Sequence, residues 1–273
     1  MNTAVLKKDG DNNYYISATH NGNFVEVLRG DLWFPNLNYT TDPEPIGGPR
    51  LSASLRKICT ILEGEDLADV ASRIGTPDER DKMDDLEFTV KFVELEIEIE
   101  AEIGKVIESG KYYEDSLRYI FHLIQLWGGS EARGIYVKNG GFENNWNYET
   151  YRYIASTCVN AVHEQSDNTV ECLMHLLAHD YPNRIRQFGL SFASKHFRFW
   201  NSFVERPHLA ILDKVVCEGL FGKAPSAALY REYTKKLLEF QAESNIPALD
   251  VESKLFEYFQ SKEGKIWIKL RKG

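Results

Sequence analysis

Residues 170–221 constrain the fold of this chain most, because they combine helical periodicity with a glycine turn. Residues 170–179 show the apolar spacing of an amphipathic helix, and a short basic stretch then leads to Gly189. A second helix is predicted next, with Lys195 in its first turn, and Asp213 follows 18 residues later near the start of a third helix. This order predicts a helical hairpin whose backbone amides and second-helix N-terminus can hold a phosphate.

Lys195 is surrounded in the sequence by aromatic residues, with Phe192 before it and Phe199 and Trp200 after it. An amine that is partly buried among such side chains loses its proton more readily and becomes a usable nucleophile. Asp213 ends an apolar run one helix later, so its carboxylate is predicted to lie opposite that amine. The two residues therefore predict a lysine nucleophile with a carboxylate partner.

Helical patterns dominate from residue 50 onward. Residues 94–103 alternate between apolar and acidic side chains, which favours a strand. A wider apolar stripe over 88–106 and a capping signal at Thr76 favour a long helix instead. We therefore predict a long helix. A loop rich in glycine and aromatic residues follows Gly128. Further helices are predicted at 51–62, 66–74, 114–127, 148–163, 168–179, 193–205, 208–221, 226–243 and 250–261.

The N-terminal part differs in its pattern. Two β-prone runs, 14–17 and 24–28, flank an Asn-Gly pair, which is the strongest short signal for a β-hairpin. A linker rich in proline and glycine follows over 35–49. We therefore predict a mostly α protein with a small N-terminal β-hairpin or mixed extension. Its three regions are a hairpin segment with linker (1–48), an acidic helical region (49–110) and a helical domain (111–273).

The charge is unevenly distributed. The net charge of −9 argues against general affinity for nucleic acid. Acidic residues are concentrated in 84–102, whereas basic residues are concentrated in 184–208 and in the tail from Lys262. A local basic surface therefore remains compatible with DNA binding, and the acidic half suits a protein partner.

The cysteine pattern and the hydropathy narrow the class of protein further. The four cysteines form no C-x-x-C pair, which is typical of ordinary buried thiols in a reducing compartment. No apolar stretch is long enough to span a membrane, so we predict a cytoplasmic protein that does not enter the membrane. Cys172, His175 and His179 share a helical face but lack the intervening glutamate of metalloproteases, so we predict neither a metal nor a cofactor.

The segment from 115 to 222 resembles the helix-hairpin-helix DNA glycosylase superfamily, and within it the bacterial proteins similar to 8-oxoguanine DNA glycosylase. In that superfamily a lysine on the second helix of the hairpin and an aspartate after an apolar segment have similar spacing, and Lys195 and Asp213 fall on those positions. The chain departs from the pattern at its hairpin, where Gly189-Leu190-Ser191-Phe192 replaces a tight Gly-x-Gly. It also lacks the histidine that often follows the aspartate, and the four-cysteine iron–sulfur loop.

The resemblance implies a glycosylase and β-lyase that flips an oxidised purine, such as 8-oxoguanine, out of duplex DNA and forms a lysine Schiff base. It implies Lys195 and Asp213 as catalytic residues. Expected base-pocket residues are Trp127, Gly128, Phe192, Phe199 and Trp200. Expected phosphate contacts are Arg184, Arg186, Gly189, Ser191, Ser194 and Arg198.

A rival interpretation is that the chain has the glycosylase fold but does not catalyse base excision or strand cleavage. The altered hairpin and the negative net charge favour a repurposed protein that binds a modified base, a nucleotide or a partner protein, for example in a bacterial defence system. The preferred lesion, the opposite base, the oligomeric state and the role of residues 1–110 stay open at this point.

Overall fold

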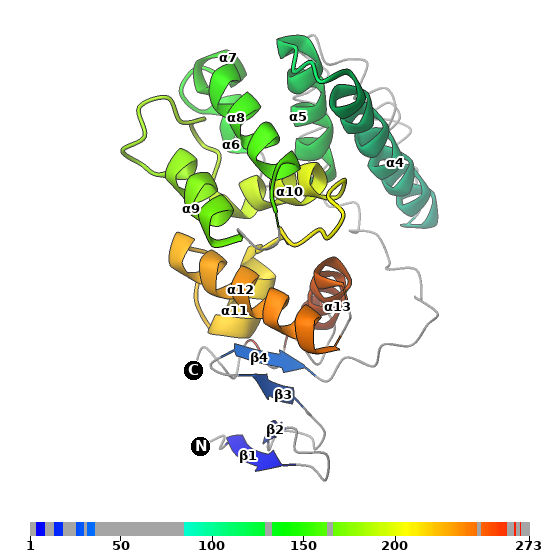
Figure 1. The fold of residues 1–273 in the computed structure, drawn as a ribbon, viewed down its shortest axis with the longest axis vertical. Helices are drawn as coiled ribbons and strands as arrows, with labels where there is room; N and C mark the ends of the chain where they lie inside the picture. Colours follow the sequence, from blue (N-terminus) through cyan, green and yellow to red (C-terminus); the bar gives the residue numbers. More distant parts are fainter. Residues whose placement is uncertain are drawn as a thin grey trace. The chain divides into compact units, whose positions relative to one another are not determined.

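The structure is a computed structural model, and the part of the chain that it describes is mostly α-helical, as predicted (Figure 1). The described residues are 4–8, 14–18, 26–29, 32–35, 85–128, 133–162, 166–244, 247–260, 265 and 268. The helices predicted at 51–62 and 66–74 lie outside them, as does the capping signal at Thr76.

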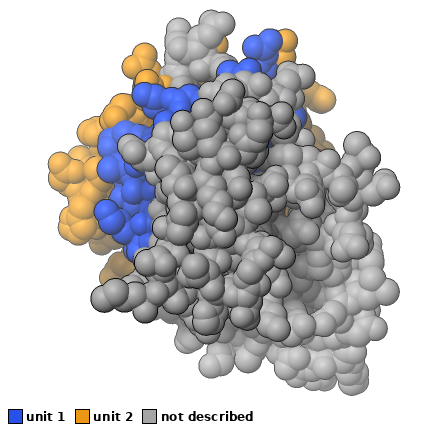
Figure 2. All heavy atoms as spheres, turned by 90° about the horizontal axis from the view of Figure 1, so that it is seen from below, with its two compact units in different colours: residues 1–44, 206–273 blue, residues 45–205 orange. Residues whose placement is uncertain are grey.

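The chain divides into two compact units (Figure 2). Unit 1 comprises residues 1–44 and 206–273, and unit 2 comprises residues 45–205. This division groups residues 206–273 with the N-terminal strands. It therefore differs from the predicted boundaries at 48 and 110, which stay predictions.

Over its described residues, unit 2 contains a long helix, two short helices and four helices of intermediate length. Their bounds are α4 Asp85–Ser109, α5 Glu114–Gly128, α6 Arg133–Val137, α7 Phe142–Asn145, α8 Tyr148–Val159, α9 Ser166–Leu177 and α10 Leu190–Asn201. The predicted helices at 114–127, 148–163 and 168–179 are confirmed to within a few residues. The glycine-rich loop after Gly128 holds the two short helices.

The acidic, alternating run is helical, as we predicted. Leu95, Ile99, Ile103 and Val106 recur at helical spacing on α4 and are buried, whereas Ile97 is 62% exposed. A strand would have put Ile97 on the same face as Leu95 and Ile99, so the burial pattern itself identifies the helix. The helix contacts α5 and α10.

An aromatic core joins the helices of unit 2 around Phe121 of α5. The Phe121 ring lies 5.0 Å from the ring of Tyr151 on α8, 4.7 Å from that of His196 on α10 and 5.0 Å from that of Trp146 (centroid distances). Phe121, Tyr151 and His196 are fully buried. This packing fixes α5, α8 and α10 relative to one another.

The helix that carries Lys195 begins earlier than predicted. The prediction was 193–205, but α10 runs from Leu190 to Asn201 with Gly189 as its N-cap. Lys195 therefore lies in the second turn and not in the first. The shift follows from Gly189, whose extended backbone accepts the first helical hydrogen bonds from the amides of Phe192 and Ala193 at 3.0 and 2.9 Å.

In the part of unit 1 that the structure describes, a four-stranded antiparallel sheet is combined with three helices. The strands are β1 Ala4–Lys8, β2 Tyr14–Ala18, β3 Glu26–Arg29 and β4 Leu32–Pro35, in the order β1-β2-β3-β4. The helices are α11 Lys214–Phe221, α12 Ala227–Ser244 and α13 Ala248–Gln260, and α11 and α13 both contact β4. Strands β2 and β3 overlap the two runs of the predicted hairpin, but the Asn-Gly turn lies outside the described residues, so the hairpin stays a prediction.

The helix predicted at 208–221 is also shorter than expected. Only 214–221 is helical, because Asp213 has the extended backbone of an N-cap (φ −80°, ψ 177°). The preceding residues 208–212 are buried and not helical. The predictions at 226–243 and 250–261 match α12 and α13.

In the part of the chain that the structure describes, every helix is too short or too polar to cross a membrane.

Candidate functional site

The Lys195 amine lies where the C-terminal end of α5 meets α10. Its Nζ donates a hydrogen bond to the backbone carbonyl of Gly128 at 2.8 Å and lies 4.4 Å from the centroid of the Phe192 ring. The carbonyl lies at the C-terminus of α5, where the helix dipole is negative, and the ring face also attracts a cation. Both contacts stabilise the ammonium charge. Taken as a whole, the Lys195 residue is partly exposed.

Gly128 permits this contact because it has no Cβ. A Cβ at this position would lie 3.1 Å from Lys195 Cδ and 3.2 Å from Phe192 Cε1, which is tighter than most real contacts of a Cβ atom. The predicted helix stop at Gly128 therefore coincides with a close approach of two elements that are 67 residues apart in the sequence. We call Gly128, Phe192 and Lys195 the lysine cradle.

A buried polar network holds the inner face of α10. The Trp200 indole donates to the Tyr151 hydroxyl (3.1 Å), which pairs with His196 Nδ1 (2.7 Å), while His196 Nε2 lies 3.0 Å from the Gln125 amide. The Gln125 amide nitrogen donates to Nε2, so the neutral ring keeps its proton on Nδ1 and donates it to the Tyr151 hydroxyl. Lys195 precedes His196 on α10 and is turned by about 100° around the helix, at a partly exposed position.

The two histidines of this core are held neutral. The pKa of His196 lies well below its usual value because of burial, and the positive charge of Lys195 acts in the same direction. Burial likewise lowers the pKa of His122 to about 3, with a smaller effect from Arg118. The network was missed from the sequence, although His196 lies on the apolar stripe of Ala193, Phe197 and Trp200 and could have been identified there.

The turn between α9 and α10 presents the predicted phosphate-binding residues Arg184, Arg186 and Gly189. The Arg186 side chain and Gly189 are exposed, and Arg184 is partly exposed. Buried Ile185 and Phe188 anchor the turn, and the Arg186 amide donates to the Asn145 carbonyl at 2.9 Å. These contacts hold the two arginines on a fixed backbone at the start of α10.

The other predicted phosphate contacts make hydrogen bonds or ion pairs within the unit. Ser194 is fully buried and its hydroxyl donates to the Ser191 carbonyl at 3.3 Å. Arg198, with 17% of its side chain exposed, pairs with Glu96 of α4 at 3.6 Å. Burial raises the pKa of Glu96, and the Arg198 charge partly offsets that rise. Their phosphate role stays a prediction.

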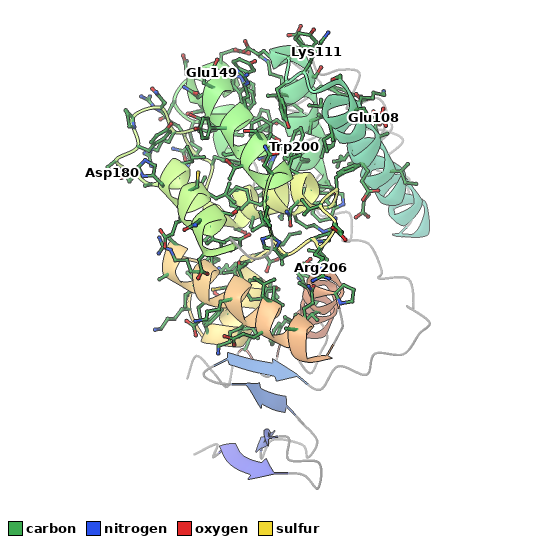
Figure 3. All side chains as sticks on the ribbon, viewed as in Figure 1. Glu108, Lys111, Glu149, Asp180, Trp200 and Arg206 are labelled. Atoms are coloured by element: carbon green, nitrogen blue, oxygen red, sulfur yellow. The ribbon has the colours of Figure 1, made fainter. Side chains whose placement is uncertain are left out.

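The predicted pocket aromatics have different surroundings. Phe199 and Trp200 are fully buried, and Figure 3 shows Trp200 inside the helical bundle. Trp127 at the end of α5 is partly exposed, and its ring meets Phe199 edge to face at 4.9 Å. Among the predicted pocket residues, Gly128 and Phe192 lie beside the Lys195 side chain.

Asp213 lies in unit 1 and caps α11. Its carboxylate accepts a hydrogen bond from the Val216 amide at 2.8 Å, which fixes the side chain at the helix N-terminus. Buried Cys217, one turn into α11, has its pKa raised to about 12 by burial, with Asp213 and Glu218 adding to the rise. Since Lys195 belongs to unit 2, the pairing of the two predicted catalytic residues stays a prediction.

The structure also locates the remaining sulfur and imidazole groups considered from the sequence. Cys158, Cys172 and Cys217 are free thiols. His175 contacts the Tyr181 ring edge to face at 5.3 Å, and His179 is exposed. Over the described ranges, no group of three metal-ligating side chains converges.

Comparisons with protein-family models, with curated proteins and with solved structures found no match to this chain.

Proposed function

We propose that this chain is a helix-hairpin-helix DNA glycosylase with β-lyase activity that removes an oxidised purine similar to 8-oxoguanine. The observation that carries the proposal is the placement of the Lys195 amine, which is held at a partly exposed position on α10 just after a turn that presents two arginines. The family likeness of Lys195 and Asp213 supplies the reaction type and the class of base.

In the proposed reaction, the damaged nucleotide leaves the duplex and its sugar approaches Lys195. The Lys195 ammonium first loses a proton to solvent. The neutral amine nitrogen then forms a bond to C1′ while the bond from C1′ to the base breaks, and the base leaves with the electron pair and takes up a proton. The nitrogen then loses its proton and the sugar ring opens to a Schiff base. Loss of a C2′ proton breaks the C3′–O bond, which nicks the strand.

Asp213 is proposed to stabilise the positive charge that develops on the sugar. Its hydrogen bond from Val216 supports that role, since it leaves the carboxylate in one orientation. Arg184 and Arg186 are the proposed phosphate contacts, because their turn leads directly into the helix that bears Lys195.

The test is a paired measurement on duplex DNA that contains 8-oxoguanine. Release of the free base is followed by chromatography and nicking of the strand by gel. Wild type should do both, Asp213→Asn should lose most of each, and Asp180→Asn, at an exposed turn position, should match wild type. Base release without nicking would remove the lyase step, and absence of both would contradict the proposal.

A second function is favoured by the ion pair of Arg198 with Glu96 and by the net charge of −9. Both reduce the positive charge available to a DNA backbone, which suits a protein that binds a modified base or nucleotide without cutting DNA. Binding of free 8-oxoguanine or its nucleoside by calorimetry, together with no product from duplex DNA, would establish this alternative.

A further inference from the structure

We infer that Gly128 and Phe192 are positioning residues that fix the nucleophilic amine of Lys195, an inference that rests on the proposed function for its catalytic meaning. The sequence suggested both only as walls of a base pocket. Their contacts point to the lysine itself, since the Gly128 carbonyl accepts its hydrogen bond and the Phe192 ring lies beneath its charge.

The Lys195 side chain lies against Gly128 at two points along its length. A lysine has several rotatable bonds, and ordering its end lowers its entropy. Here the stem passes close to Gly128, since a Cβ there would lie 3.1 Å from Cδ, and the end is restrained at Nζ by the carbonyl of the same residue at 2.8 Å. Gly128 therefore lies beside two atoms of the side chain, and a larger residue there would displace the stem or the Phe192 ring by a few tenths of an ångström.

Phe192 supplies the third restraint. It lies one turn before Lys195 on α10, so its ring and the amine share a helix face. The ring is 9% exposed, and its Cε1 and Cδ1 atoms would lie 3.2 and 3.4 Å from a Cβ at Gly128. The ring is thus wedged against the end of α5, and it cannot turn away from the amine without opening that contact.

The backbone beneath the cradle is rigid as well. His196 and Trp200, which follow Lys195 on α10, are fully buried and hydrogen-bonded to α8 through Tyr151. A nucleophile must approach its carbon within a narrow range of distance and angle, so a fixed amine reacts faster than a mobile one with a sugar that bound DNA holds opposite it. A freely diffusing aldehyde needs no such alignment, so it reacts more slowly with an amine whose ammonium form the cradle stabilises. We therefore expect the cradle to increase the rate of the covalent step and to leave the affinity for DNA unchanged.

The test uses variants that perturb the cradle and matched variants that do not. Gly128→Ala introduces the tight contact, whereas Gly104→Ala, also within a helix, brings its Cβ no closer than 3.7 Å to Phe203. Phe192→Leu keeps an apolar side chain and removes the ring, and Phe192→Tyr keeps the ring. Thermal melts of all four show that each variant is folded.

The first measurement needs no DNA. Each protein is treated with formaldehyde and cyanoborohydride, and methylation of Lys195 is compared by peptide mass spectrometry with that of Lys105, whose side chain is 69% exposed. Loss of the ring contact should raise the relative methylation rate of Lys195 about two- to fivefold in Phe192→Leu. Gly128→Ala should also raise it, while Gly104→Ala and Phe192→Tyr should match wild type. Equal rates in all five proteins would overturn the cradle.

The second measurement connects the cradle to the reaction. Borohydride trapping on abasic duplex DNA should be slower at saturating DNA in Gly128→Ala and Phe192→Leu, with the DNA concentration for half-maximal rate unchanged. A changed half-maximal concentration with an unchanged rate would overturn the positioning role. If wild type gives no trapped product, the proposed function fails, and the methylation rates still decide whether the cradle holds the amine.

Discussion

Acid sensitivity of the core of unit 2 is the prediction whose size follows most directly from the structure. His122 is buried on α5, its Nδ1 pairs with the Tyr136 hydroxyl at 2.7 Å, and burial lowers its pKa to about 3. The unfolded chain has an ordinary histidine with a pKa near 6.5. Below that pH the unfolded state binds a proton that the folded state does not, so stability falls as the pH falls.

The magnitude follows from the linkage between pKa and stability. Each pH unit between the two pKa values removes about 1.4 kcal/mol of unfolding free energy. Because the unfolded histidine is only half protonated at pH 6.5, His122 alone should remove about 2 kcal/mol between pH 6.5 and pH 4.5. The His122→Gln variant keeps a hydrogen-bonding group for Tyr136 but has no proton to gain, so it should lose about 2 kcal/mol less over the same range.

The assay is urea unfolding followed by tryptophan fluorescence at pH 7.5, 6.5, 5.5 and 4.5. His122→Gln is expected to be less stable than wild type at pH 7.5 and to approach or pass it at pH 4.5. His179→Gln, which changes an exposed histidine, is the control and should show the wild-type dependence. Parallel curves for wild type and His122→Gln would refute the reasoning.

Three further predictions concern packing, a loop and DNA contact. Gly219→Ala places a Cβ against the ring of buried Phe259, so urea unfolding should show unit 1 destabilised by about 1–3 kcal/mol. Asn145→Ala removes the amide that contacts the carbonyls of residues 135, 138 and 141 at 2.7–2.8 Å, and the melt should show a loss of about 2–4 kcal/mol. Arg184→Gln and Arg186→Gln should each weaken duplex binding and lower the slope of log affinity against log salt by about 1; unchanged slopes would remove the phosphate role.

Periodicity predicted most of the helices because a buried stripe leaves a direct trace in the sequence. The run over 94–103 illustrates this, since its local alternation suggested a strand while the wider stripe through Leu95, Ile99 and Ile103 identified α4. Boundaries were less predictable, because they depend on capping. Gly189 and Asp213 both have extended backbones, and each moved the start of its helix relative to the prediction.

The candidate site was less predictable than the fold, because its contacts join residues that are distant in the sequence. The sequence around Lys195 does not indicate that the carbonyl of Gly128 accepts a hydrogen bond from its amine. The sequence does not distinguish Arg198 from Arg184 and Arg186 as a phosphate contact. In the structure, Arg198 forms an ion pair with Glu96 on another helix. Such pairings arise from tertiary packing, which composition and spacing do not encode.

The most direct test of the lysine mechanism is borohydride trapping on duplex DNA that contains 8-oxoguanine, with the attachment site mapped by mass spectrometry. Wild type should give a covalent complex attached at Lys195, and Lys195→Gln should give none. Lys138→Gln, which changes an exposed lysine of the same unit, should trap like wild type. A complex that persists in Lys195→Gln, or no complex in any of the three proteins, would contradict the lysine mechanism.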